Sequence, residues 1–308
     1  MVGEVNLPPS GQARFMVKLY YKFVFGFINL VSLLPFWVLH RISEVLFLLV
    51  YYVVGYRKGM VLDNIKRSFP EKSEKEARQI RKDFFRHFSD LLVESVKSAT
   101  MGQKEFQRRY FVKNQHLLDA YHKMGKSIIV LSPHTGNWEW IFSLVPVIPY
   151  EVYAVYQRLT NPHMDQYIRK TRQRYGAMMI PTTQTFKIIK NAAERGAQFL
   201  TWFAADQSAR PGKAQWVKFL NQDTSFHKGY EDLARQTGQS VFFLDIRKVK
   251  RSHYELELHL ITDTPEALPQ GAIVEEFARL TERRIREDPP YWLWSHNRWK
   301  HKRPNVRN

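Results

Sequence analysis

The hydrophobic pattern divides the chain into an apolar N-terminal part and a longer part in which short apolar runs alternate with amphipathic stretches. Residues 23–39, FVFGFINLVSLLPFWVL, contain no charged side chain, and a second apolar run, VLFLLVYYVVGY, covers 45–56. A helix needs about 20 apolar residues to cross a bilayer. The first run is therefore barely long enough to span, and the second is too short to span alone. Pro35 and the polar sequence HRISE at 40–44 are expected to interrupt a single continuous helix.

Positive charges flank these apolar runs on both sides. Lys18 and Lys22 precede the first run, and Arg57 and Lys58 follow the second. Cations at both ends leave the membrane topology open. No small-residue cleavage site follows the runs, which argues against a cleaved signal peptide. We therefore predict that residues 1–58 form an uncleaved helical membrane anchor, and a buried helical hairpin of a soluble domain is the alternative.

Residues 71–97, EKSEKEARQIRKDFFRHFSDLLVESVK, have the pattern of an amphipathic helix. Apolar residues such as Ala77, Ile80 and Phe84 recur at spacings of three and four among charged residues. Ser73, with Glu76 three positions later, predicts a capping box at the start. The polar face of this helix is expected to be solvated.

After Gly125 the pattern changes to an alternation of apolar runs and amphipathic segments. The runs predict strands and the amphipathic segments predict helices. The predicted strands are 127–133, 150–158, 177–181, 197–206, 241–249 and 254–262, and the predicted helices are 161–176, 182–196, 226–238 and 274–287. This order predicts a layered α/β domain over residues 59–308.

A titratable pair, His134 and Glu139, follows the first of these strands in the sequence HTGNWE. Five residues of regular helix turn through about 500°, so the two side chains share a site only if His134 precedes the helix. Glu139 then bonds one imidazole nitrogen and stabilises the imidazolium, and the other nitrogen accepts a proton as a general base. A surface pair, or a histidine satisfied at a helix start, is the alternative.

No nucleophile or metal is evident beside this pair. The segment offers no serine in an obvious attacking position, so the attacking group is expected to be a hydroxyl of the substrate. No second histidine lies three or four positions from His134, and the other histidines are scattered. The pattern therefore predicts no metal site.

The charge balance narrows the classes of partner. The chain has 47 Lys and Arg against 29 Asp and Glu, a net charge of +18. Such a basic chain favours an anionic partner. The classes that fit are a nucleic acid, a membrane surface, an acidic protein and a phosphorylated substrate, and charge alone does not choose among them. The chain has no cysteine, which excludes disulfides, thiolate metal sites and a cysteine nucleophile.

Five ordered blocks carry a resemblance to a known family. They are HTGNWEW (134–140), YQRLTNPHMD (156–165), AADQS (204–208), SFHKGYEDLARQTG (225–238) and WLWSHNRWK (292–300). Together they resemble the late acyltransferases of lipid A biosynthesis, within the lysophospholipid acyltransferase superfamily. His134 and Glu139 match the superfamily's H-x4-[DE] motif, and the sequence GNWE within it is typical of the lipid A enzymes.

The resemblance implies a fold, a reaction and a location. The fold is an acyltransferase-type α/β domain behind an N-terminal membrane anchor. The reaction is transfer of a fatty acyl chain from acyl carrier protein to a hydroxyl of a lipid A precursor, a late step of lipopolysaccharide or lipooligosaccharide biosynthesis, with no cofactor beyond the acyl-carrier-protein thioester. The location is the bacterial inner membrane, with the active site on the cytoplasmic side, and no nucleic acid is expected as a partner.

The resemblance also assigns the first site residues. It makes His134 the general base and Glu139 its orienting partner. Arg158 is expected to bind a substrate phosphate or to steady the developing oxyanion, unless it is an ordinary surface arginine. Asp206 and Gln207 match an aspartate–glutamine pair, in which the aspartate orients Arg158 or a substrate hydroxyl, or else caps the next turn.

Three further residues are assigned on the same ground. Gly229 allows close approach of the backbone to substrate or of a helix to the sheet, or it is a plain turn residue. His296 and Arg298, near Lys300, are expected to meet head-group phosphates, and a solvated charged face is the alternative.

Two other functions remain open. A lysophosphatidic acid or other glycolipid acyltransferase would keep the His134 and Glu139 pair and change the acceptor. A non-catalytic membrane or nucleic-acid binding protein would use the cations and tryptophans to contact phosphates and bases. The apolar 23–56 region counts against a soluble nucleic-acid binder.

Overall fold

The computed structural model describes residues 11–304, so the first ten residues of the predicted anchor and the last four of the predicted domain lie outside it. The N-terminal part forms two α-helices and a π-helical segment that continues the second: α1 (Gly11–Ser32), α2 (Phe36–Leu48) and η1 (Leu49–Val54). The break between α1 and α2 falls directly before and at Pro35, as predicted. The predicted interruption at HRISE is wrong, because residues 40–44 lie inside α2.

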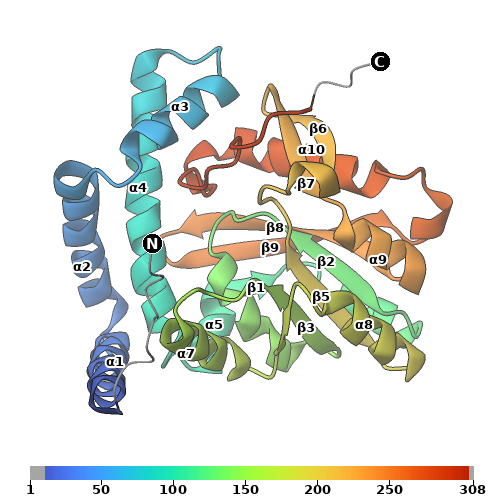
Figure 1. Ribbon diagram of the computed structural model, residues 1–308, viewed down its shortest axis with the longest axis horizontal. Coiled ribbons are helices and arrows are strands. Elements are labelled where there is room, and N and C mark those ends of the chain that lie inside the picture. The colour runs from blue at the N-terminus through green and yellow to red at the C-terminus, as the bar shows by residue number, and fades with distance from the viewer. Residues whose placement is uncertain (1–10, 305–308) are drawn as a thin grey trace, which may run out of the picture.

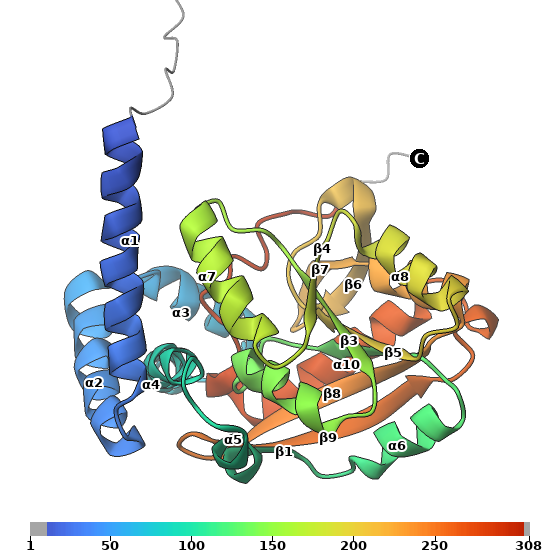
Figure 2. The same cartoon turned by 90° about the horizontal axis from the view of Figure 1, so that it is seen from below.

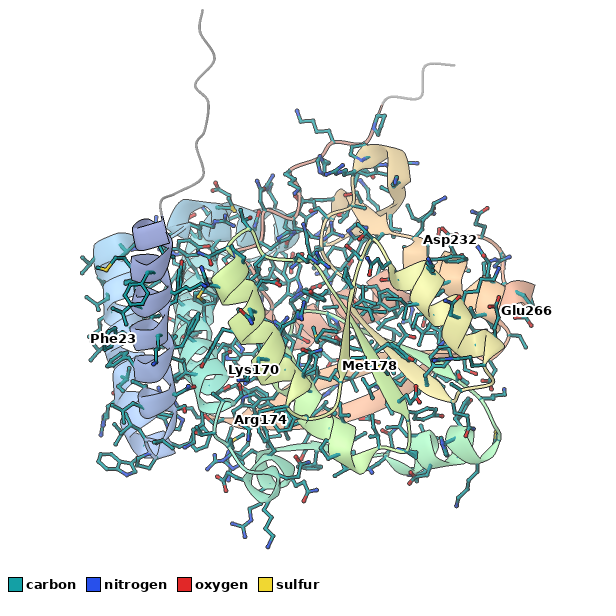
Figure 3. The ribbon with its side chains drawn as sticks, turned by 60° about the horizontal axis from the view of Figure 1, so that its bottom comes forward. Phe23, Lys170, Arg174, Met178, Asp232 and Glu266 are labelled. Carbon is teal, nitrogen blue, oxygen red and sulfur yellow. The ribbon has the colours of Figure 1, made fainter. Side chains whose placement is uncertain are left out.

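Two stretches of this N-terminal part, Phe15–Leu33 and Phe36–Val54, are long and apolar enough to cross a membrane. Their outer side chains are exposed, with Phe23 of α1 at 71% and Trp37 of α2 at 70%. Figure 3 shows Phe23 on the side of α1 that faces away from the rest of the protein. An apolar surface of this extent indicates association with a membrane.

A mixed sheet forms the centre of the molecule, with strand order β1-β9-β8-β2-β5-β3-β4 (Figure 1). Its neighbouring strands are parallel, except for the antiparallel pair β8 and β9. The strands are β1 (Tyr110–Val112), β2 (Ile128–Ser132), β3 (Glu151–Tyr156), β4 (Met178–Pro181), β5 (Phe199–Ala204), β8 (Ser240–Lys250) and β9 (His253–Thr262). The sheet and its helices confirm the predicted α/β class.

Helices cover the sheet and connect its strands (Figure 2). They are α3 (Lys58–Ser68), α4 (Glu74–Lys97), α5 (Gln103–Arg109), α6 (His116–Lys123), α7 (Pro162–Gln173), α8 (Thr185–Glu194), α9 (Gly229–Thr237) and α10 (Ala272–Glu287), with 3-10 helices η2 (Trp138–Val147), η3 (Pro211–Lys213), η4 (Pro265–Ala267) and η5 (Pro289–Tyr291). The side chain of Asn161 caps α7 by accepting from the backbone N–H groups of His163 and Met164. Helix α7 therefore begins where Asn161 and Pro162 predict a start, and it ends at Gln173, three residues before the predicted end.

A two-stranded hairpin, β6 (Ala214–Phe219) and β7 (Gln222–His227), was not predicted. It takes Phe226 and His227, so the helix predicted from 226 begins at Gly229 instead. The turn residues Leu220 and Asn221 have φ values of 49° and 64°. Two positive φ values are typical of a type I′ hairpin turn, and without a glycine at either position the turn carries no clear sequence signal.

Helix α4 lies between α2 and the sheet (Figure 1). Its start carries the predicted capping box, in which Ser73 and Glu76 each bond the other's backbone N–H. The prediction of a solvated polar face is wrong, because His87, Asp90 and Glu94 are buried. These side chains bond residues of α2, of the segment joining β8 to β9 and of the turn that follows β2.

Two apolar cores fill the space on the two faces of the sheet. Successive residues of β2 alternate between them: Ile129 and Leu131 belong to one core, and Ile128 and Val130 belong to the other. Because neighbouring residues of a strand point to opposite faces, a strand that is buried throughout reads as an unbroken apolar run. This burial on both faces is the reason that SIIVLSP is so apolar. The strand ends at Ser132, two residues before His134.

Candidate active site

The site begins where β2 and β5 end at the same edge of the sheet. These two strands are parallel neighbours, and Ser132 lies opposite Ala204. His134 and Asp206 each follow two residues later, so the register of the strands places them side by side. Two side chains that are 72 positions apart in the sequence are thereby brought into contact.

Asp206 holds the imidazole of His134 by two bonds. His134 Nδ1 lies 2.5 Å from Asp206 Oδ1, and the backbone N–H of His134 donates to Asp206 Oδ2 at 3.0 Å. A carboxylate only accepts, so Nδ1 carries the proton of the bond and Nε2 of the neutral ring is unprotonated. The His134 side chain is 12% exposed and that of Asp206 only 2%. The ring is therefore fixed in one tautomer, and its basic nitrogen is on the side away from Asp206.

The segment after α10 completes the surroundings of Asp206. The indole N–H of Trp292 donates to Asp206 Oδ2 at 2.7 Å. The backbone N–H of Leu293 donates to the carbonyl of His134 at 3.1 Å. The predicted block 292–300 therefore contributes to the site through Trp292, which sequence reasoning did not single out.

The bonds to Asp206 decide its protonation state. Burial by itself raises the pKa of a carboxyl, but the charge of His134 and the hydrogen bonds from His134 and Trp292 together hold the pKa of Asp206 below its ordinary value. Asp206 is therefore ionised at neutral pH and can stabilise an imidazolium at His134.

Glu139 does not take the predicted place beside the imidazole. Its carboxylate pairs with Arg172 of α7, with Arg172 Nη2 lying 2.8 Å from Oε1 and Nε 3.2 Å from Oε2. Within residues 11–304 no hydrogen bond joins Glu139 to His134, because the 3-10 helix that begins at Trp138 presents Glu139 to α7. The expectation that Glu139 orients His134 through a hydrogen bond is corrected: Asp206 does so.

Gln207 lies at the basic nitrogen of His134. Its side-chain Nε2 is 3.4 Å from His134 Nε2, and the Trp138 ring meets the imidazole edge-on at a centroid distance of 5.2 Å. The predicted pair Asp206 and Gln207 is thus brought to His134. Asp206 bonds the histidine and makes no bond to Arg158 among the described residues. In the same part of the chain no group of three His, Asp or Glu side chains lies close enough to hold a metal ion.

Arg158 and Gly229 lie outside this cluster of contacts. Arg158 follows β3 at the active-site edge of the sheet, is exposed, and makes no ion pair or hydrogen bond within residues 11–304. A Cβ built on Gly229 would meet no protein atom within 4 Å. Close packing of a helix on the sheet therefore does not account for Gly229, and its contact with substrate stays a prediction.

Arg298 is buried, contrary to the expectation that it lies on a surface for head-group phosphates. It is 1% exposed, its Nη1 donates to the carbonyl of Ser225 at 2.7 Å, and its guanidinium lies 4.3 Å from the centre of the Phe226 ring. Burial lowers the pKa of Arg298 to about 10, so it is still charged at neutral pH. It therefore ties the C-terminal segment to β7.

His296 packs beside Ser208, with its Nε2 3.4 Å from the Ser208 hydroxyl. Burial lowers the pKa of His296 to about 4, so the ring is neutral at neutral pH. The positive charge that the predicted phosphate contact requires is absent from this ring at neutral pH, and Lys300 next in the segment is exposed.

The family model of bacterial lipid A biosynthesis acyltransferases matches residues 9–301. The chain belongs to this family.

Two named relatives agree with this assignment. A lipid A biosynthesis acyltransferase of Haemophilus influenzae is 23% identical over 299 residues, which cover 95% of this chain and 94% of the relative. Lipid A biosynthesis acyltransferase 2 of Shigella flexneri is 22% identical over 157 residues, so that match spans about half of each chain, 51% and 49%. Among solved structures, the 1-acyl-sn-glycerophosphate acyltransferase PlsC of Thermotoga maritima aligns with a TM-score of 0.38 and 15% identity, over 82% of this chain and 99% of that one.

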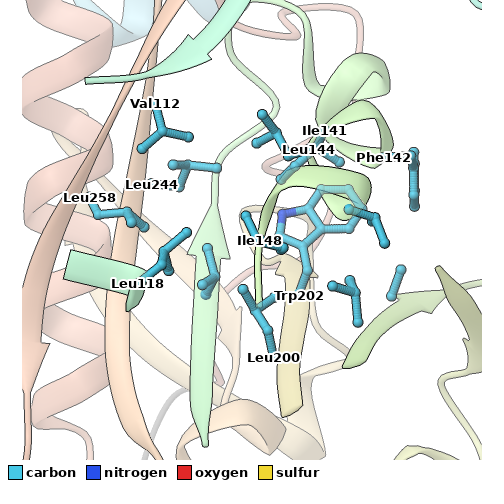
Figure 4. A pocket seen from close by; sticks show the side chains of 14 residues that line it. Val112, Leu118, Ile141, Phe142, Leu144, Ile148, Leu200, Trp202, Leu244 and Leu258 are labelled. Carbon is cyan, nitrogen blue, oxygen red and sulfur yellow. The ribbon is translucent and has the colours of Figure 1, made fainter. Parts of the chain in front are cut away.

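An apolar cavity lies beside η2, the 3-10 helix that begins directly after the turn at Gly136 and Asn137 (Figure 4). The cavity has a volume of about 40 Å³ and is lined by apolar side chains, among them Ile141, Leu144, Leu200 and Trp202. Sites that bury small-molecule ligands have volumes of about 300–1,000 Å³, so an acyl chain would enter here only if these side chains moved.

Proposed function

We propose that this member of the lipid A acyltransferase family transfers a fatty acyl chain from the thioester of acyl carrier protein to a hydroxyl of a lipid A precursor, with His134 as the general base. The observation that supports this most strongly is the bond of 2.5 Å between His134 Nδ1 and the buried Asp206. It leaves Nε2 as the basic atom at the edge of the sheet, where α/β folds hold their ligands.

The reaction follows from this geometry. His134 Nε2 removes the proton from the acceptor hydroxyl as its oxygen attacks the thioester carbonyl, and Asp206 stabilises the imidazolium that forms. The tetrahedral intermediate collapses, the carbon–sulfur bond breaks, and the departing thiolate takes the proton from His134. The products are the new ester and the free thiol of the carrier protein.

Glu139 has a different role in this proposal from the one expected of it. Its contact with Arg172 holds a guanidinium near the catalytic turn, with Arg172 Nη2 2.9 Å from Glu139 Oε2. The pair is partly exposed, with side-chain exposures of 24% for Arg172 and 26% for Glu139. We assign Glu139 to the placement of Arg172 and Asp206 to the orientation of His134.

The proposed donor, acceptor and location suit the rest of the molecule. The net charge of +18 favours an acidic carrier protein and a phosphorylated lipid. The two apolar helical stretches favour a protein that works at the bacterial inner membrane, with the site on the cytoplasmic side. Exposed at the active-site edge, Arg158 is a candidate to bind a phosphate of the precursor or the developing oxyanion. We propose no cofactor beyond the acyl-carrier-protein thioester.

Mass spectrometry of the purified protein with acyl carrier protein thioesters and a lipid A precursor in detergent tests this function. A gain of one acyl unit on the precursor, lost in His134→Ala, is the expected result. His116→Ala is the matched control, because His116 is exposed at the start of α6. Acylation of a lysophospholipid in place of the precursor would establish the other acceptor class, and no transfer to either would refute an acyltransferase function.

A further inference from the structure

The turn that follows β2 packs closely against β8 at Gly136. Gly136 has a φ of 56°, and a Cβ built on it would lie 2.7 Å from Cγ2 of Ile246 and 3.1 Å from its carbonyl oxygen. Only glycine fits this conformation and this space. His134 stands two residues before this turn, so the bonds made by residues 136 and 137 bear on its position.

Glu94 of α4 holds the second of these residues. Asn137, with no exposed surface, donates from Nδ2 to Glu94 Oε2 at 2.6 Å. The other side-chain atom of Asn137, Oδ1, accepts from the backbone N–H of Trp140 at 3.2 Å and caps η2. The Trp140 indole donates to the backbone carbonyl of Glu94 at 3.0 Å. Glu94 thus fixes both the turn and the helix that follows it.

His87 of α4 holds the other residue of the turn. Its Nε2 lies 3.1 Å from the carbonyl oxygen of Gly136, and its Nδ1 lies 3.2 Å from Lys248 Nζ. A carbonyl only accepts and an ammonium only donates, so Nε2 carries the proton and Nδ1 accepts. Burial, followed by the charge of Lys248, lowers the pKa of His87 to about 3, which agrees with a neutral ring in this tautomer.

Both residues are hydrogen-bonded onward to helix α2. Glu94 Oε1 accepts from the Ser252 hydroxyl at 2.8 Å, and that hydroxyl oxygen lies 2.8 Å from His40 Nε2 of α2. On the His87 side, Lys248 Nζ donates to Asp90 Oδ2 at 3.2 Å.

Asp90 then completes the second connection. Its Oδ1 accepts from the hydroxyl of Ser43, also on α2, at 2.7 Å. Two continuous chains of hydrogen bonds therefore run from α2, through α4, to the catalytic turn. Networks of this kind fix the groups at their ends when every member is satisfied.

We propose that Glu94 and His87 are positioning residues for acyl transfer, which hold the catalytic turn at Gly136 and Asn137 and link its geometry to helix α2. This inference rests on the proposed function for its kinetic test. It assigns α2 a role in the active site in addition to its apolar outer surface.

The first test compares two substitutions at His87. His87→Leu removes the donor to Gly136, and His87→Gln keeps an N–H close to the position of Nε2. We expect His87→Leu to lower kcat about 100-fold with little change in KM, because displacement of a reacting group by about 1 Å has an effect of that size. His87→Gln should recover most of this loss. Equal kcat in wild type and a folded His87→Leu would overturn the proposal, as would an equal loss in both variants.

The second test cuts the links to α2 with mild variants. Ser43→Ala removes the bond to Asp90, and Ser252→Gly removes the hydroxyl at a residue whose φ of 57° suits glycine. Each should lower kcat about three- to tenfold, the size of one hydrogen bond. Ser95→Ala on α4 is the matched control, because within residues 11–304 the Ser95 hydroxyl bonds only the Leu91 carbonyl of the same helix. Wild-type kcat in both link variants would contradict the connection to α2.

A third measurement separates this proposal from the proposed function. Nitrogen-15 NMR of the imidazole of His134 reports the geometry of the turn without any substrate. We expect its signals to shift in His87→Leu and Glu94→Gln and to stay unchanged in Ser95→Ala. If wild type transfers no acyl chain, the proposed function fails, and unshifted signals in the His87 and Glu94 variants would separately refute the positioning role.

Discussion

Two carboxylates lie near the catalytic turn, and their surroundings differ in kind. Asp206 is buried and accepts from His134 Nδ1, from the backbone of His134 and from the Trp292 indole. Glu139 is partly exposed and pairs with Arg172 alone among the described residues. The motif spacing indicates Glu139 as the partner of His134, but the register of the parallel strands gives that place to Asp206.

The difference has an energetic consequence. A buried carboxylate that loses its partners retains the full cost of its desolvation. Removing the bond between Asp206 and His134 is therefore strongly unfavourable. A partly exposed ion pair such as Glu139 with Arg172 contributes about 0–1 kcal/mol, because water competes for both charges. Substitutions at the two carboxylates should therefore differ in both the size and the nature of their effects.

The largest effect is expected from Asp206→Asn. The asparagine keeps the shape of the side chain but removes the charge that stabilises the imidazolium, and its amide can impose the other tautomer on His134. Turnover should fall by about 10³-fold or more, as in the Ser-His-Asp triad when asparagine replaces the aspartate behind the histidine. The check is kcat and KM with an acyl carrier protein thioester and a lipid A precursor.

Asp223→Asn is the control for this substitution, because Asp223 pairs with Lys218 at 3.6 Å on the hairpin of β6 and β7. Turnover within a few-fold of wild type in a folded Asp206→Asn protein would break the comparison between the two carboxylates.

A smaller effect is expected from Glu139→Gln. Glutamine still accepts one hydrogen bond from Arg172, and the loss of one partly exposed charge should lower turnover about tenfold or less. Arg172→Met should have a similar effect, and the two changes together should be no worse than one, because they remove the same contact. A loss as large as that of Asp206→Asn would show that Glu139 acts directly on the reaction.

A loss of about tenfold in kcat is also expected from Trp292→Phe, because it removes one hydrogen bond to a charged group, worth about 1.5 kcal/mol or more. The bond in question joins the indole N–H to Asp206 Oδ2 at 2.7 Å. Trp299→Phe is the matched control, since the Trp299 indole donates to the Thr224 hydroxyl at 2.8 Å, away from Asp206. Equal kcat in the two variants would remove Trp292 from the description of the site.

The smallest effect concerns stability in acid. The pKa of Asp206 is lowered in the folded protein from its ordinary 3.8, so its contribution to stability is present above that pH and is lost as the pH falls through the lower folded value. The melting temperature of wild type should therefore exceed that of Asp206→Asn at pH 7, and the difference should shrink by a few degrees below pH ~3.8. A difference that does not change with pH would contradict an ionised, paired Asp206.

Much of the fold could be predicted because apolar pattern and capping residues are local signals. The strand before His134, the helix that Asn161 caps and the capping box at Ser73 all stand in the sequence where the structure has them. The hairpin of β6 and β7 could not be predicted, because its turn uses Leu220 and Asn221 at positive φ without a glycine.

The sequence predicted which residues belong to the site better than it predicted which of them bond to each other. His134, Asp206 and Gln207 were identified and do lie together, but which carboxylate bonds the imidazole depends on a pairing between strands 72 positions apart. No spacing within one segment records such a pairing. Arg172 and Trp292 were missed for the same reason, since each acts through a residue distant in sequence.

The polar face of α4 teaches a related lesson. Charged residues at helical spacing usually face water. Nothing in the sequence of this helix distinguishes His87 and Glu94, which are buried against other polar groups, from residues that face water. Their burial is explained only by partners from α2, from residues 248–252 and from the catalytic turn.

Whether Asp206 or Glu139 is the partner of His134 is tested most sharply by nitrogen-15 NMR of His134 in wild type, Asp206→Asn and Glu139→Gln, with His134→Gln used to assign the signals. We expect a protonated Nδ1 and a basic Nε2 in wild type, the same pattern in Glu139→Gln, and a changed tautomer or a lost Nδ1–H signal in Asp206→Asn. The opposite outcome, a signal that survives Asp206→Asn and is lost in Glu139→Gln, would contradict the assignment of Asp206 as the partner of the general base.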